Sequence, residues 1–113
     1  MLTKQMVEEL AVKLETALDE VTDTGETVVQ AAELVERTTN VLLREHVYVG
    51  KNVDARKLER EALLTEAPVL EEAQAGLTAA DREWSLAKNE LEVVRAEIKL
   101  WTALAYQLSG VGK

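Results

Sequence analysis

The feature that most constrains the fold is a row of apolar residues that repeats along the second half of the chain. Its members follow one another at alternating steps of three and four residues. They are Leu70, Ala73, Leu77, Ala80, Trp84, Ala87, Leu91, Val94, Ile98, Trp101, Ala105 and Leu108. This spacing is the heptad repeat of a helix that buries one stripe against other helices, and a sustained repeat predicts left-handed supercoiling. We therefore expect a coiled-coil helix here.

The composition agrees with a helical chain. Of the 113 residues, 47% are hydrophobic but only 4% are aromatic, with no Phe, one Pro and five Gly. The abundance of Ala, Leu, Glu, Lys and Arg favours helix over sheet. We predict one all-α domain over residues 1–113, in which two shorter amphipathic helices precede one long coiled-coil helix.

The first helix is expected over residues 2–22 and the second over residues 27–48. Their apolar rows are Val7, Leu10, Leu14, Ala17 and Val21, and then Val28, Ala31, Val35, Leu42 and Val49. Residues 23–26 predict a turn between them, because Gly25 can take positive φ, and Thr24 or Thr27 could cap the helix that follows. Gly50 and Asn52 predict the next connection, with Asp54 as the cap of the third helix.

The third helix is expected over residues 54–108, kinked near Pro68. Pro68 removes one backbone hydrogen bond, but the apolar row keeps its phase from Leu70 onward. In the alternative, one helix ends near Thr65 and another begins at Thr78, where the sequence resembles a capping box.

The expected helix lengths predict an oligomer. A helix of 55 residues would span roughly 80 Å, whereas the two earlier helices would span about 30 Å each and leave much of it uncovered. A second apolar row, Leu86, Val93, Leu100 and Leu104, would add to the exposed surface. The oligomer interface is expected at Leu77, Trp84, Leu91, Val94, Ile98, Trp101 and Leu108. The alternative is a monomeric three-helix bundle that folds back at Pro68.

The residues give no sign of catalysis. There is no Cys, and the one His, His46, lacks a second His at metal-ligand spacing. The acidic pairs are typical of solvated helix faces. We expect no enzyme, no cofactor, no metal site and no small-molecule substrate. We see no signal peptide and no membrane span, and we expect a cytoplasmic protein without membrane contact.

The charge of the segment 42–60 runs against the rest of the chain. The formal net charge of the protein is -8, which opposes bulk attraction to nucleic acid, yet this segment holds five cations against three carboxylates. Arg56 and Arg60 share a helix face, and Tyr48 offers a ring for base stacking. The expected nucleic-acid-binding residues are Arg44, Tyr48, Lys51, Arg56, Lys57 and Arg60. The alternative is that these cations pair with neighbouring carboxylates.

The run from Asp81 to Trp101, preceded by Arg56 and Lys57, resembles the small helical bacteriophage proteins that accompany single-strand annealing or recombinase genes. More distantly it is similar to UvsY-type recombination mediators. The resemblance covers about the second half of the chain, and it implies an oligomer that binds single-stranded DNA and a recombinase in a bacterial host. The acidity of this chain departs from that pattern.

Two hypotheses of function therefore remain. The first is a recombination accessory protein that binds single-stranded DNA. The second is a structural, adaptor or assembly-chaperone protein of the coiled-coil type, which binds a protein partner and no nucleic acid.

Overall fold

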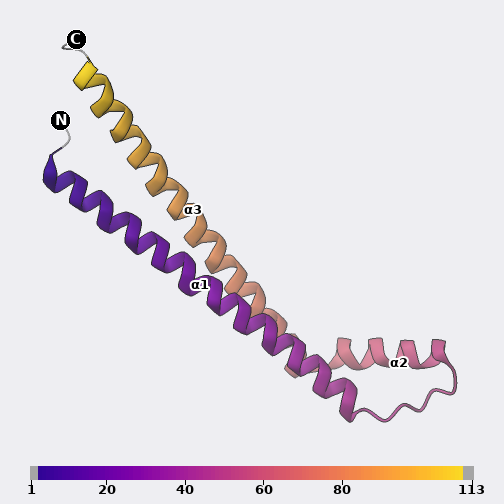
Figure 1. Cartoon of the computed structure of the whole chain (residues 1–113). Coiled ribbons are helices and arrows are strands. Elements are labelled where there is room, and N and C mark those ends of the chain that lie inside the picture. The colour runs from indigo at the N-terminus through magenta and orange to yellow at the C-terminus, as the bar shows by residue number, and fades with distance from the viewer. Residues whose placement is uncertain (1–2, 111–113) are drawn as a thin grey trace. The chain divides into compact units, whose positions relative to one another are not determined.

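The computed structural model describes residues 3–110, and these residues form three α-helices (Figure 1). They are α1 (Lys4–Glu45), α2 (Val53–Glu66) and α3 (Pro68–Gly110). No residue of this range lies in a strand. The predicted all-α class is confirmed, and α1 and α2 are both shorter than α3. The expected start of the first helix at residue 2 lies outside the described residues.

The turn expected at residues 23–26 was wrong, because α1 continues through it without interruption. The hydroxyl of Thr24 does not cap a new helix but donates to the Glu20 carbonyl oxygen at 2.7 Å, within the same helix. Val21 and Val28 are seven residues apart, so the apolar repeat keeps its phase across Gly25. Burial of one continuous stripe outweighs the local turn preference of a single glycine, which costs about 1 kcal/mol inside a helix.

Contacts within the chain group into two compact units. We call residues 3–25 together with 82–110 the terminal unit, and Glu26–Asp81 the loop unit. In the terminal unit, the first part of α1 runs antiparallel to α3, since Lys13 meets Glu97 and Gly25 meets Trp84.

The core of the terminal unit is made by the two heptad rows. Ala17, Leu91 and Val94 are buried, and Leu14, Val21 and Ile98 pack against them. At Gly25 an added Cβ would lie 3.2 Å from Nε1 of Trp84, so the glycine lets the indole ring approach the α1 backbone closely.

The loop unit is built from the end of α1, all of α2 and the start of α3. Its buried residues are Leu70, Ala73 and Ala80, all from the predicted row on α3. The row on α1 continues with half-buried side chains, namely Val28, Ala31, Val35, Thr38 and Leu42. Thr39 lies inside α1, and its hydroxyl donates to the Val35 carbonyl oxygen at 2.8 Å, so this polar side chain is satisfied within the helix.

The helix expected over residues 54–108 is divided at Ala67. This residue is extended, with φ -82° and ψ 109°, as is normal for a residue that precedes proline. Pro68 takes the first position of α3, where its missing N–H costs nothing, and the Ala67 carbonyl oxygen accepts from Glu71 N at 3.1 Å. In the alternative, the helix end near Thr65 is confirmed, since α2 ends at Glu66, but the start at Thr78 is wrong, because Gly76 and Thr78 lie inside α3.

The premise that the earlier helices are too short to cover α3 was wrong for α1. With 42 residues α1 spans about 63 Å, nearly the length of α3 with its 43 residues. The two helices expected before α3 are one helix, α1, and α1 is therefore the partner of the α3 row within the same chain.

Candidate functional site

The connection between α1 and α2 is organised by one carboxylate. Glu59, on α2, accepts a hydrogen bond from the Val49 amide at 3.1 Å and another from the Gly50 amide at 3.1 Å. Its Oε2 also lies 2.6 Å from Nε2 of His46, and the His46 ring meets the Tyr48 ring edge to face at 4.9 Å. Glu59 thus ties the loop back onto α2.

The environment of Glu59 favours its ionised form. The hydrogen bond from His46 lowers the pKa of the Glu59 carboxyl, partial burial acts in the opposite direction, and the amides of Val49 and Gly50 lower the pKa further. The net direction is downward. The interactions therefore hold the loop most firmly at a pH above the ordinary pKa of a glutamate.

The far end of the loop is fixed by two hydrogen bonds between side chains and the backbone. Asn52 caps α2, with its Oδ1 accepting from the Ala55 amide at 2.7 Å, so the expected cap at Asp54 was wrong by two residues. Arg56 Nε donates to the Gly50 carbonyl oxygen at 2.9 Å. A Cβ at Gly50 would come within 3.1 Å of the Arg56 backbone nitrogen, so the loop passes α2 too closely for a larger residue.

The residues predicted to bind nucleic acid lie along this loop and its two flanking helices. Arg44 is in the last turn of α1, and Lys51 is in the loop. Arg56, Lys57 and Arg60 lie on α2 with exposed side chains. Arg56 turns toward the loop backbone instead of pairing with a carboxylate. The structure thus brings Arg56 and the loop together and leaves Lys57 and Arg60 directed to solvent.

Nothing in the sequence pattern pointed to Glu59. It lies 13 residues from His46 and 10 from Val49, separations that carry no helical or strand periodicity. Only the presence of a lone His before a Gly-containing loop could have suggested a loop with a polar anchor.

The residues predicted for an oligomer interface lie in both units. Leu91 and Val94 are buried and Ile98 packs beside them, against α1 of the same chain. Trp84 and Trp101 are half-buried in the terminal unit, and Leu77 is half-buried in the loop unit. Leu108 is 59% exposed. An intrachain partner therefore occupies the central part of this row, and the oligomer remains a prediction.

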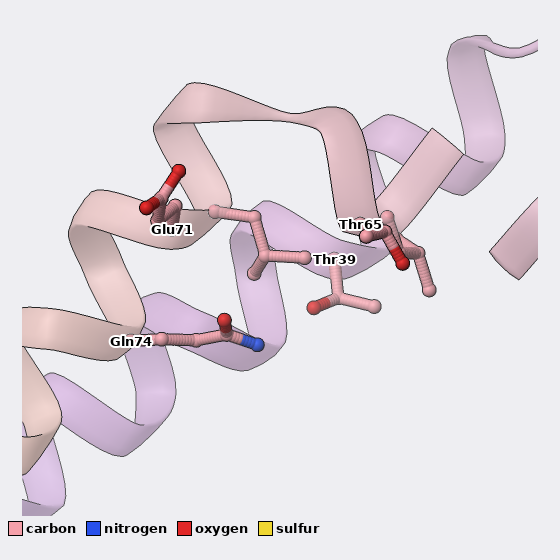
Figure 2. A pocket seen from close by; sticks show the side chains of 6 residues that line it. Thr39, Thr65, Glu71 and Gln74 are labelled. Atoms are coloured by element: carbon pink, nitrogen blue, oxygen red, sulfur yellow. The ribbon is translucent and has the colours of Figure 1, made fainter. Parts of the chain in front are cut away.

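A hollow of about 360 Å³ lies in the loop unit, where all three helices contribute side chains. Figure 2 labels Thr39 from α1, Thr65 from α2, and Glu71 and Gln74 from α3. Leu64 and Leu70 complete the lining. Glu71 is the one titratable residue among these six, so the hollow offers hydrogen-bonding groups without an acid–base pair.

The outer face of α3 in the terminal unit carries a row of exposed apolar side chains. Leu86, Val93 and Leu100 follow one another at intervals of seven residues and are 62%, 65% and 59% exposed. Val93 borders a hollow of about 340 Å³ that Val12 of α1 lines from the other side. The sequence predicted this second row, and its side chains at these three positions are exposed among the residues that the structure describes.

Two kinds of feature are absent from the described part of the chain. Between residues 3 and 110 no group of three or more His, Asp or Glu side chains is placed to hold a metal ion. None of the helices within this range has the length and apolar character needed to cross a membrane.

The resemblance to bacteriophage recombination proteins rests on the helical texture of residues 81–101, which the structure places in α3 almost entirely within the terminal unit. A helical texture is shared by many unrelated proteins. The resemblance therefore remains a prediction. Comparison with protein-family models, with curated protein sequences and with solved structures found no match for this chain.

Proposed function

We propose that the protein is a non-enzymatic helical adaptor that binds another protein along its coiled-coil helices. The observation that carries this proposal is the exposed row on α3, because the central part of the heptad seam is already packed against α1 while Leu86, Val93 and Leu100 remain exposed. Ordered apolar rows on a solvent face are typical of helix-binding surfaces. The net charge of -8 agrees with a protein partner better than with a nucleic acid.

The adaptor function is tested by affinity capture from cells that express the protein, with and without nuclease. A partner retained after nuclease digestion, and lost when Val93 and Leu100 are both replaced by Asn, is the expected result. A matched control replaces Val29 and Leu58, two exposed apolar residues of the loop unit, by Asn. Capture that disappears with nuclease treatment contradicts the adaptor proposal.

A second candidate function is favoured by the loop unit. The Glu59 anchor holds the α1–α2 loop against α2, and Lys57 and Arg60 project from α2 into solvent beside it. This is the arrangement of a small phosphate-contacting patch, which an oligomer would repeat. Under this proposal the protein is a recombination accessory protein that binds single-stranded DNA and a recombinase.

Fluorescence anisotropy with a labelled single-stranded oligonucleotide separates the two candidates. The second candidate predicts salt-sensitive binding that is lost when Lys57 and Arg60 are replaced by Glu. Replacement of Lys88 and Lys99, two exposed cations of the terminal unit, is the matched control. No binding at low salt removes this candidate. Sedimentation of the same samples measures the oligomeric state, and the second candidate predicts a homo-oligomer.

A further inference from the structure

The exposed face of α3 in the terminal unit carries a complete second heptad seam. Between the three large apolar residues of the row lie smaller side chains at the intermediate positions, and the steps alternate between three and four residues. The seam comprises Leu86, Asn89, Val93, Ala96, Leu100 and Ala103, all of them exposed. Its repeat equals that of the first seam, so α3 presents two faces suited to helix packing, and α1 covers only one of them.

One edge of this second seam is acidic. Glu83, Glu90 and Glu97 follow one another at intervals of seven residues, directly beside the apolar positions. Glu90 and Glu97 line the hollow that Val93 borders, and Glu20 of α1 lines it as well. Lys13 is the only cation among the lining residues, and it pairs with Glu97 at 3.4 Å.

Two cations of α3, Lys88 and Arg95, are engaged away from the acidic edge, and the exposed Lys99 lies along the opposite edge of the seam. Lys88 lies over the Trp84 ring at 3.5 Å, on the side of α3 that faces away from the acidic edge. Arg95 pairs with Glu92 at 3.0 Å. In the described part of the chain, the one ion pair of this acidic edge is the exposed pair between Glu97 and Lys13 of α1.

This charge pattern argues against a second copy of the chain as the occupant. In an antiparallel pair of α3 helices joined through this seam, the acidic edges of the two copies would meet along one side of the pair, with Glu90 of each copy beside Glu97 of the other. Like charges at flanking positions destabilise such a pair. A helix with Lys or Arg at its flanking positions would instead meet opposite charges along the whole edge.

We propose that the seam from Leu86 to Ala103 is the docking site for a basic amphipathic helix of another protein. The partner helix packs apolar residues against the seam and sets Lys or Arg side chains against Glu83, Glu90 and Glu97. Asn89 is the one polar residue of the seam, and a single polar core position of this kind specifies register. The proposal rests on the adaptor function and names the chemistry of its partner.

The probes are two synthetic helical peptides of about five turns, which share one apolar seam with a single Asn. One peptide carries Lys at the flanking positions and the other carries Glu. Titration of the full-length protein by fluorescence anisotropy should show at least about tenfold tighter binding of the Lys peptide, weakening as salt is added. Equal binding of the two peptides, or binding of neither, overturns the proposal.

Three variants locate the site. Replacement of Val93 and Leu100 by Asn should weaken binding of the Lys peptide at least about tenfold, because the apolar contacts are lost without a change of charge. The control variant, with Val29 and Leu58 replaced by Asn, should bind as the wild type does. Replacement of Glu83 and Glu90 by Lys should reverse the preference between the two peptides, and an unchanged preference overturns the proposal.

The remaining outcomes separate this site from the adaptor function. A dimer that dissociates when Val93 and Leu100 are replaced would show that the occupant is a second copy, which contradicts the proposal. A nuclease-resistant protein partner whose capture survives that same replacement would overturn this docking site while leaving the adaptor function intact. Circular dichroism confirms that each variant remains helical.

Discussion

Each of the two units of the molecule is stabilised internally by a different kind of interaction. In the terminal unit two helices close on an apolar seam, with Leu91 and Val94 buried against Ala17. In the loop unit the connection between α1 and α2 depends on the carboxylate of Glu59 and the cap at Asn52. A repeat of apolar residues thus determines how the helices pair, whereas the loop takes its shape from individual polar contacts.

The largest loss of stability is expected when the packed seam of the terminal unit is disrupted. Leu91 is 6% exposed, and its replacement by Ala should lower the free energy of unfolding by about 2–5 kcal/mol, the cost of a cavity in a packed core. Replacement of Leu86 by Ala, on the same helix, should change it by no more than about 0.5 kcal/mol. Urea denaturation followed by circular dichroism measures both. Equal losses would contradict the assignment of one seam as packed and the other as open.

The second prediction concerns Glu59, the carboxylate that anchors the α1–α2 loop in the loop unit. Because the pKa of Glu59 is lowered in the folded protein, its contribution to stability is fully present above the ordinary glutamate pKa and is lost as the pH falls through the lowered value. Replacement of Glu59 by Gln should remove this pH dependence and speed hydrogen exchange at the amides of Val49 and Gly50. Exchange at Leu91 in the terminal unit serves as the control and should be unaffected.

That result would be contradicted by loop amides that exchange equally fast in the wild type and in the variant at neutral pH. Replacement of Glu61, an exposed carboxylate of the same helix, by Gln is the matched control for the loss of one charge.

Two glycines, Gly25 and Gly76, lie inside long helices, one in each unit, and differ in the space around them. At Gly76, in the loop unit, no atom lies within 4 Å of an added Cβ, so replacement by Ala should raise the free energy of unfolding by about 0.5–1 kcal/mol. At Gly25 the added Cβ would lie 3.2 Å from Trp84 Nε1, and crowding should cancel most of that gain. Thermal or urea unfolding of the two variants measures the difference. A larger gain at Gly25 than at Gly76 would contradict the close approach of Trp84.

The smallest expected effect concerns the pair of Lys13 and Glu97. Both side chains are substantially exposed, so a double-mutant cycle should give a coupling free energy of about 0.2–1 kcal/mol that fades in high salt. A coupling that persists in about 1 M salt would show that the pair is shielded from solvent.

The all-α fold and the seam on α3 were predictable, because the spacing of the apolar residues can be read directly from the sequence. The continuity of α1 could also have been predicted, since Val21 and Val28 are seven residues apart. The local preference of Gly25, however, favours a turn. The break at Ala67 follows from the rule for residues that precede proline. The Glu59 anchor was not predictable, because it joins residues at separations without any period.

The length of α1 shows how one local error changes an expected assembly. Two short helices in place of α1 left the α3 row without a partner of sufficient length, and this favoured an oligomer through Leu91, Val94 and Ile98. With α1 continuous, these three residues pack within the chain. The surface that remains for a partner is then the second seam, along Leu86, Val93 and Leu100.

The first seam closes within one chain, with α1 antiparallel to α3 in the terminal unit. The chain contains no Cys, so the double substitution Lys13→Cys and Glu97→Cys creates a unique thiol pair at positions whose side chains meet. A short bis-maleimide reagent is added to an equal mixture of tagged and untagged chains, and the masses of the products are measured under denaturing conditions. We predict crosslinks within single chains only, and crosslinks that join position 13 of one chain to position 97 of another would contradict the account.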